Sequence, residues 1–489
     1  MNLASACCWT LARSFVLCLI AWPICRSLER WLRAVSDRHG SLAFSLLLAP
    51  FLFPELLVGY AYRHRALSSP LLAESLCAGL LLIRMIPVGV VALMASPVSL
   101  ISDAAIHCRW LLLEANPGSM RERYHFYLCL WHGGLRRALP ALVLMGLVAF
   151  QEFELAALLQ TASWTDWFIA AQRVGLDRGE TLQQSLWPIL MQWPLLWCVV
   201  SWAVQAHDIH STSDPTESRP LSILEQVFAG LYLSLALIGG CAVPLSFLAW
   251  NLPSGLKMML RQPMSLSGLL QEIFIATAVS LCAGLAAWSL TSFVQRSTEG
   301  RPALRRWWQL LLIPGLSGSL LLSLAVVALF QQTGLRWLYD TPAPWVLALM
   351  IWLLPRAVLV QLWLDTTRST ESLYLAEMLI PETPPSASGA NLPHQKSSLN
   401  SRQASALLFR LRDQPQLMGM GLLCYWAYLD LSTSYLLAPS GMPSGLVRLY
   451  NFMHFGRSSA LSAEAFLFFG IPLLLGGLLV VPISRVLRR

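Results

Sequence analysis

Apolar residues in this chain gather into long runs that short polar segments separate. The runs are uniformly apolar and do not alternate with polar residues, which favours helices over the strands of a membrane barrel. A helix needs about 20 mostly apolar residues to cross the ~30 Å hydrocarbon core of a bilayer. We therefore predict an all-α polytopic membrane helix bundle with about eleven transmembrane helices, at positions 9–25, 43–62, 74–98, 139–160, 186–206, 222–247, 268–294, 308–330, 344–364, 417–438 and 464–484.

Composition agrees with a lipid environment. The 489 residues are 56% hydrophobic and 12% charged, whereas soluble domains are about 25% charged. The formal charge of +8 includes only two lysines, Lys257 and Lys396, so the sequence does not favour a nucleic-acid partner. Most of the eleven cysteines lie in apolar runs without metal-ligand spacing, which predicts structural thiols and neither a metal site nor a cofactor.

Arginine and lysine predict the orientation of the chain in the membrane. With the N-terminus outside, 22 of the 34 basic residues fall in cytoplasmic segments and nine fall outside. Cytoplasmic loops carry the excess of positive charge in membrane proteins. We therefore expect a multi-pass protein of the inner (plasma) membrane, with its N-terminus outside and its C-terminus in the cytoplasm.

Two parts of the chain repeat the same order of features. In each part a proline lies ten positions before an aromatic residue, Pro140 before Phe150 and Pro415 before Tyr425, across an apolar stretch. An acidic residue follows in each, Glu154 in the first part and Asp430 in the second. A repeat of this kind is typical of transporters. We predict a first half at 1–210 with about five transmembrane helices and a second half at 211–489 with six.

The arginine-rich segment before the repeated proline resembles a motif of a known family. The first copy contains Glu114, Ala115 and Gly118, and the second contains Glu371 and Ala376. Both are similar to the cytoplasmic EAA loop of permeases in binding-protein-dependent ABC importers. The segment 430–456 is similar to the end of the fused, two-domain permeases of the iron(III) and thiamine type. The resemblance covers nearly the whole chain.

The resemblance implies a function for these loops. In that family each loop forms a short helix that docks into a groove of a cytoplasmic ATPase, which gives coupling loops at 103–138 and 365–416 here. The second loop contains a Pro-, Ser- and Gly-rich segment, 381–403, which we expect to be a flexible insertion. The chain has no Gly-Lys-Ser/Thr phosphate loop, so ATP hydrolysis is expected in a partner chain. The implied partners are an ABC ATPase dimer, an external substrate-binding protein and membrane lipid.

Charged residues inside the predicted spans are candidates for the transport pathway, since each costs about 2.5–3.5 kcal/mol at the bilayer centre on insertion scales. Glu152, Glu154, Asp430, Arg84 and Arg356 are such residues, and Glu154 and Asp430 occupy matching positions of the repeat, where acids could meet a cationic solute. Other readings stay open, because the same acids could instead pair with Arg84 and Arg356 to hold the helices together, or lie near the outer interface of the membrane. No catalytic residue is predicted.

Three function classes fit the sequence. The first is the permease subunit of an ABC importer, with iron(III) favoured as the solute by the resemblance alone. The second is a secondary transporter driven by an ion gradient, which also uses duplicated halves with acids near the membrane midplane. The third is a polytopic membrane enzyme. We favour the permease, in which the chain is a transport subunit and not itself an enzyme.

Overall fold

The computed structural model describes residues 2–35, 37–96, 103–115, 118–130, 136–173, 178–208, 222–261, 263–298, 302–367 and 407–486. Within these ranges the regular elements are all helices, and no strand occurs. The predicted all-α fold class is therefore confirmed. The second predicted coupling loop, including Glu371, Ala376 and the insertion 381–403, lies outside the described residues apart from its two ends.

The helices fall into two successive series. The first series is α1 (Leu3–Ala34), α2 (Asp37–Leu52), α3 (Glu55–Ala66), α4 (Pro70–Ala95), α5 (Asp103–Ala115), α6 (Met120–Leu130), α7 (Arg136–Phe150), α8 (Glu154–Leu159), α9 (Trp164–Arg173) and α10 (Arg178–Asp208). A long helix follows, formed by α11 (Ile223–Leu237), the π-helical turn η2 (Ile238–Ala242) and α12 (Val243–Leu260). The second series is α13 (Pro263–Thr298), α14 (Pro302–Leu316), α15 (Ser319–Phe330), α16 (Arg336–Tyr339), α17 (Ala343–Thr367), η3 (Phe409–Asp413), α20 (Gln414–Leu429), α21 (Leu431–Leu437), α22 (Gly445–His454) and α23 (Ser458–Val486).

Five helices in the described residues are long and apolar enough to cross a membrane, and they lie at Leu3–Ala34, Pro70–Ala95, Ile223–Leu260, Leu266–Ser297 and Ala343–Asp365. Two bent pairs raise the number to seven if each pair is one span. These helices indicate a membrane-embedded protein. The predicted count of about eleven spans is not confirmed, because several predicted runs are divided between two helices or are too short.

Four of the predicted spans are broken in the middle. The run 43–62 is divided between α2 and α3, which meet at 64° beside Pro54, and the run 308–330 between α14 and α15, which meet at 109°. Gly318, at the second bend, has φ +101°, a conformation that favours glycine. The runs 139–160 and 417–438 are interrupted after Phe150 and at Asp430, where the short helices α8 and α21 follow. Hydropathy averaged over a whole run does not report these interruptions, because the many apolar residues outweigh the few polar ones at the breaks, such as Glu55 and Asp430.

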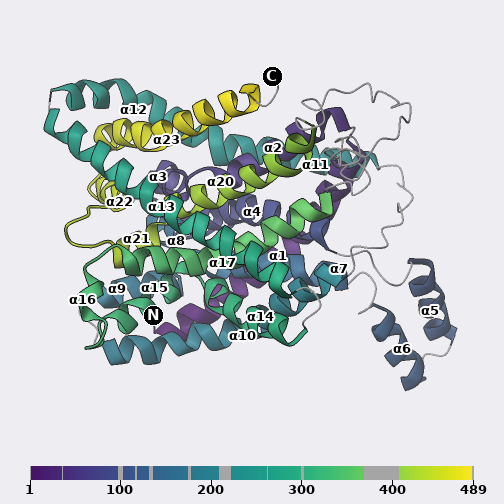
Figure 1. The fold of residues 1–489 in the computed structure, drawn as a ribbon. Coiled ribbons are helices and arrows are strands. Elements are labelled where there is room, and N and C mark those ends of the chain that lie inside the picture. The colour runs from purple at the N-terminus through teal and green to yellow at the C-terminus, as the bar shows by residue number, and fades with distance from the viewer. Residues whose placement is uncertain are drawn as a thin grey trace, which may run out of the picture.

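The two series repeat the same packing. In the first, α1, α4 and α7 pack against one another, and in the second, α13, α17 and α20 do the same. The pieces beyond the breaks also match, since α3 packs on α8 and α15 packs on α21. The series meet where α4 contacts α17 and where α10 contacts α14. Figure 1 shows the resulting bundle, with the N-terminus at the end away from α5 and α6.

Close packing at a glycine gives a testable prediction on stability. A Cβ atom on Gly315 of α14 would collide with the carbonyl oxygen of Ile351 on α17, whereas nothing lies within 4 Å of a Cβ on Gly421 of α20. Gly315→Ala is expected to destabilise the fold by about 1–3 kcal/mol through overpacking. Gly421→Ala, the matched control, is expected to be neutral or to stabilise by up to about 1 kcal/mol through helix propensity. Thermal unfolding of the purified chains in detergent measures both, and an equal melting temperature for the two variants would contradict the prediction.

Candidate functional site

A cavity of about 290 Å³ lies where the two helix series meet. The C-terminal parts of α2, α7, α14 and α20 line it, together with the second half of α4 and the middle of α17. Its walls are mostly apolar, and the aromatic side chains among them are Phe44, Phe51, Phe153, Trp352, Trp363 and Trp426. Phe44 of α2 stacks on Trp363 of α17 at 4.8 Å between ring centroids, so that the cavity wall joins the two series directly.

Charged side chains line one end of the cavity, and mostly apolar side chains line the rest of it. The polar end lies at the helix breaks, where Glu152, Glu154 and Asp430 line it. From there the lining of α4 continues from Arg84 to Ala95, a rise of about 16 Å at 1.5 Å per residue. These α4 positions lead toward α5, which follows α4 in the chain. The apolar length of the cavity therefore extends from the breaks toward the end of the bundle that carries α5.

Six charged side chains line the polar end: Glu55, Arg84, Glu152, Glu154, Arg356 and Asp430. Arg84 forms an ion pair with Glu55 and donates a hydrogen bond to the carbonyl oxygen of Phe53 at 3.1 Å. Arg356 donates to the carbonyl oxygen of Trp352 at 2.7 Å, and its guanidinium carbon lies 3.7 Å from the centre of the Trp352 ring. Among the described residues, neither arginine forms an ion pair with Glu154 or Asp430. The predicted alternative, in which these acids pair with the two arginines, is therefore not what the structure contains.

Two of the acids cap short helices. Glu152 accepts a hydrogen bond from the backbone N–H of Leu155 at 2.8 Å, and Asp430 accepts one from the backbone N–H of Thr433 at 2.8 Å. Both bonds join a carboxylate to the amide three residues later, in the first turn of α8 and of α21. Asp430 is the N-cap of α21, and Glu152 lies one residue before the N-cap of α8. Judged by this hydrogen bond, Glu152 in the first helix series occupies the position that Asp430 has in the second. The sequence had matched Asp430 with Glu154 instead, because an acid's distance from a proline does not reveal which acid caps the helix.

Glu154 differs from its neighbours in the cluster. It is partly buried, lines the cavity and is the first residue of α8. Within the described part of the chain no hydrogen bond or ion pair engages its carboxylate, whereas Glu55 is paired with Arg84, and Glu152 and Asp430 are helix caps. Glu154 is thus the acid of the cluster whose charge the protein leaves available to a ligand.

Two of the helix breaks, those that follow α2 and α14, are each stabilised by a side chain from the other series. Gln151, the residue that follows α7, donates to the carbonyl oxygen of Leu316, the last residue of α14, at 2.6 Å. Tyr425 of α20 donates to the carbonyl oxygen of Leu52, the last residue of α2, at 2.8 Å. The last carbonyls of a helix have no partner within the helix itself. We call this pair of bonds the reciprocal caps, because each series satisfies a broken helix of the other.

The first predicted coupling loop forms a helical hairpin. Figure 1 shows α5 and α6 beside each other and away from the rest of the bundle. Arg109 of α5 forms an ion pair with Glu122 of α6 at 3.5 Å. Glu114, Ala115 and Gly118 are all exposed at the turn of the hairpin. Large apolar side chains on both helices are exposed as well, namely Trp110, Leu111, Leu112, Met120, Tyr124, Tyr127 and Leu128. This surface is suited to contact with another protein.

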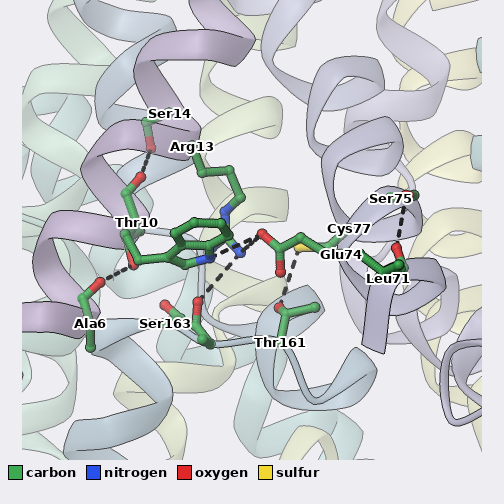
Figure 2. A network of polar contacts seen from close by, with 12 residues as sticks. Ala6, Thr10, Arg13, Ser14, Leu71, Glu74, Ser75, Cys77, Thr161 and Ser163 are labelled. Carbon is green, nitrogen blue, oxygen red and sulfur yellow. Dashed lines mark hydrogen bonds and ion pairs between the residues drawn. The ribbon is translucent and has the colours of Figure 1, made fainter. Parts of the chain in front are cut away.

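Further buried charges lie away from the cavity, and the sequence did not single them out. Figure 2 shows Arg13 of α1 directed at Glu74 of α4, with Thr161 beside Cys77. The Arg13–Glu74 ion pair measures 3.0 Å, and Arg13 is nine-tenths buried. In the second series Arg448 of α22 contacts Glu272 of α13 at 3.1 Å and Glu464 of α23 at 2.5 Å. The only sequence signal for these pairs is a charge within an apolar run, which does not identify the partner.

No family model, curated protein or solved structure matches the chain. The fold and the cavity therefore carry the functional argument, together with the motif resemblance in the sequence.

Proposed function

We propose that the chain is the membrane permease of an ABC importer, with two permease halves, 1–210 and 211–489, in one polypeptide. The observation that supports this most is the cavity between two series of helices that repeat the same packing, with broken helices at its polar end. Non-helical backbone at membrane depth occurs where it is buried in protein or lines a cavity. Transporters place their substrate sites at such breaks, between repeated halves.

The α5–α6 hairpin supports an ATPase as the source of energy. It follows α4, whose lining of the cavity runs toward this end of the bundle, so a force on the hairpin would act on a helix of the pathway. Its exposed apolar residues provide the contact surface that a docking groove requires. We place the hairpin, with Glu114, Ala115 and Gly118, in the cytoplasm. The N-terminus and a substrate-binding protein are then outside, and the C-terminus is inside the cell.

The solute in this proposal is a small cation. Four carboxylates and two guanidinium groups line the polar end of the cavity, which leaves an excess of negative charge. The motif resemblance favours iron(III). A secondary transporter is the second candidate, since broken helices with acids at the break also suit coupling to an ion gradient.

Copurification tests the proposal. The tagged full-length chain, extracted from its native membrane in mild detergent, is expected to bring down a protein with a Gly-Lys-Ser/Thr phosphate loop and ATPase activity, identified by mass spectrometry. The exposed Leu111 lies on the hairpin, and Leu111→Asp is expected to reduce the bound ATPase about tenfold or more by placing a charge in an apolar contact.

The matched control is Leu71→Asp, an equally drastic change at an exposed position in the first turn of α4. It is expected to leave ATPase binding unchanged, because a carboxylate is tolerated at a helix N-terminus. An ATPase that stays bound to the Leu111→Asp chain would remove the hairpin from the contact. Uptake that a protonophore abolishes while ATP is maintained would favour the secondary transporter.

A further inference from the structure

We propose that the cavity binds an organic cation, with an apolar body along the aromatic walls and a cationic group next to Glu154. The inference rests on the proposed function, in that it takes the cavity as the solute site. It goes beyond that function by stating which chemistry the site recognises, and it does not favour a bare or hydrated metal ion.

The balance of charge points to a cation. Arg84 is engaged by Glu55, and Arg356 lies over the Trp352 ring, where its charge faces an aromatic surface. Glu152 and Asp430 each accept a backbone hydrogen bond, and Glu154 remains without a hydrogen bond or ion pair among the described residues. Glu154 is partly buried and lines the cavity, so a cation bound there would supply the partner that the described residues do not.

The side chains that line the walls of the cavity determine which chemical groups the bound cation can have besides its charge. Along α4 the lining residues beyond the cluster are Val88, Val91, Ala92 and Ala95, and the facing α17 contributes Leu359 and Trp363. These side chains offer no ligands to a metal ion and no hydrogen bonds to its hydration shell. They do offer apolar surface and aromatic faces, which attract organic cations through both burial and cation–π contact.

The described residues of the site do not provide the set of ligands that a metal ion needs. No group of three or more His, Cys, Asp and Glu side chains in the described residues is arranged to hold a metal ion. Two arginines line the cavity together with the acids, and Glu152 and Asp430 already accept backbone hydrogen bonds at the starts of short helices. One free carboxylate at the end of an apolar cavity suits a single cationic head group better than a metal that requires several oxygen ligands.

Binding of three matched probes to the purified full-length chain tests the inference. The probes are 4-phenylbutylammonium, 4-phenylbutanol and 4-phenylbutyrate, which share one body and differ in charge. Isothermal titration is expected to give the ammonium at least a tenfold higher affinity than the alcohol, and no binding of the carboxylate. Glu154→Gln is expected to remove the preference for the ammonium over the alcohol, whereas Glu154→Asp is expected to retain it.

Two controls make the outcome specific. Glu180→Gln, at an exposed glutamate in the first turn of α10, is expected to leave all three affinities unchanged. Retention of alcohol binding by the Glu154→Gln chain shows that its cavity is intact. Equal affinities for the three probes, or an ammonium preference that survives Glu154→Gln, would overturn the inference. Binding of iron(III) citrate in place of the ammonium would overturn it too, while the ATPase copurification, measured separately, decides the permease proposal.

Discussion

Val91→Trp is expected to stop solute uptake while the protein still folds and reaches the membrane. Val91 lies on α4, between the charged cluster and Ala95, and its half-buried side chain lines the cavity. An indole at this position would fill much of a cavity of about 290 Å³ and would leave a solute no passage to the polar end. We expect the initial rate of uptake to fall by at least about tenfold, the loss that a steric barrier of 1.4 kcal/mol produces.

The measurement uses cells without the native gene and follows the solute whose accumulation the native chain restores. Val16→Trp is the matched control, because Val16 is 52% exposed on α1 and does not line the cavity. The same enlargement there is expected to leave uptake near its native rate. Normal uptake by the Val91→Trp chain, at a normal amount of protein in the membrane, would show that the solute passes elsewhere.

Uniform hydropathy was enough to predict the all-α fold and the five helices that are long and apolar enough to span a membrane. It could not predict where helices break. The run 43–62 is mostly apolar, with Glu55 as its one charged residue, yet α2 ends at Leu52, because Pro54 follows and Tyr425 from the other series binds the exposed carbonyl. That bond joins residues 373 positions apart. A break stabilised by so distant a residue leaves no local signal beyond the proline or glycine itself.

The candidate site was predictable as a set of charges but not as a set of contacts. Glu154, Asp430, Arg84 and Arg356 were selected because charges are rare in apolar runs, and all four line the same cavity. The residues that these four side chains contact could not be inferred from their spacing in the sequence. Arg84 pairs with Glu55, which follows Pro54 at the start of α3 and was not among the predicted candidates. Opposite charges in separate helices can be assigned to one another only when the packing is known.

For the α5–α6 hairpin, the sequence motif predicts which residues belong to a loop, whereas the structure shows which side chains are exposed. The motif resemblance identified Glu114, Ala115 and Gly118 as loop residues, and the structure places them at an exposed turn. The motif itself contains none of the large apolar side chains that are exposed on the two helices, such as Trp110 and Tyr127. In an amphipathic pattern with few polar positions, the exposed face can be recognised only after the hairpin is seen to stand away from the bundle.

Loss of the reciprocal caps is expected to damage transport more than stability. Tyr425→Phe removes the hydroxyl that binds Leu52, and Gln151→Leu removes the amide that binds Leu316. Each change leaves a carbonyl oxygen at a helix break without that donor, which costs about 1–3 kcal/mol where the oxygen is buried. Because each bond joins the two series, both variants are expected to lower the melting temperature by several degrees and to reduce uptake about tenfold.

Tyr428→Phe is the matched control for this prediction. The Tyr428 hydroxyl donates to the carbonyl oxygen of Phe468 at 2.7 Å, but both residues belong to the second series. The variant is therefore expected to lose similar stability and to keep most of its uptake, because the contact between the series is unchanged. If the two tyrosine variants lose stability and uptake in the same proportion, the caps act only in folding. A selective loss of uptake in Tyr425→Phe would show that transport depends on how each series holds the broken helix of the other.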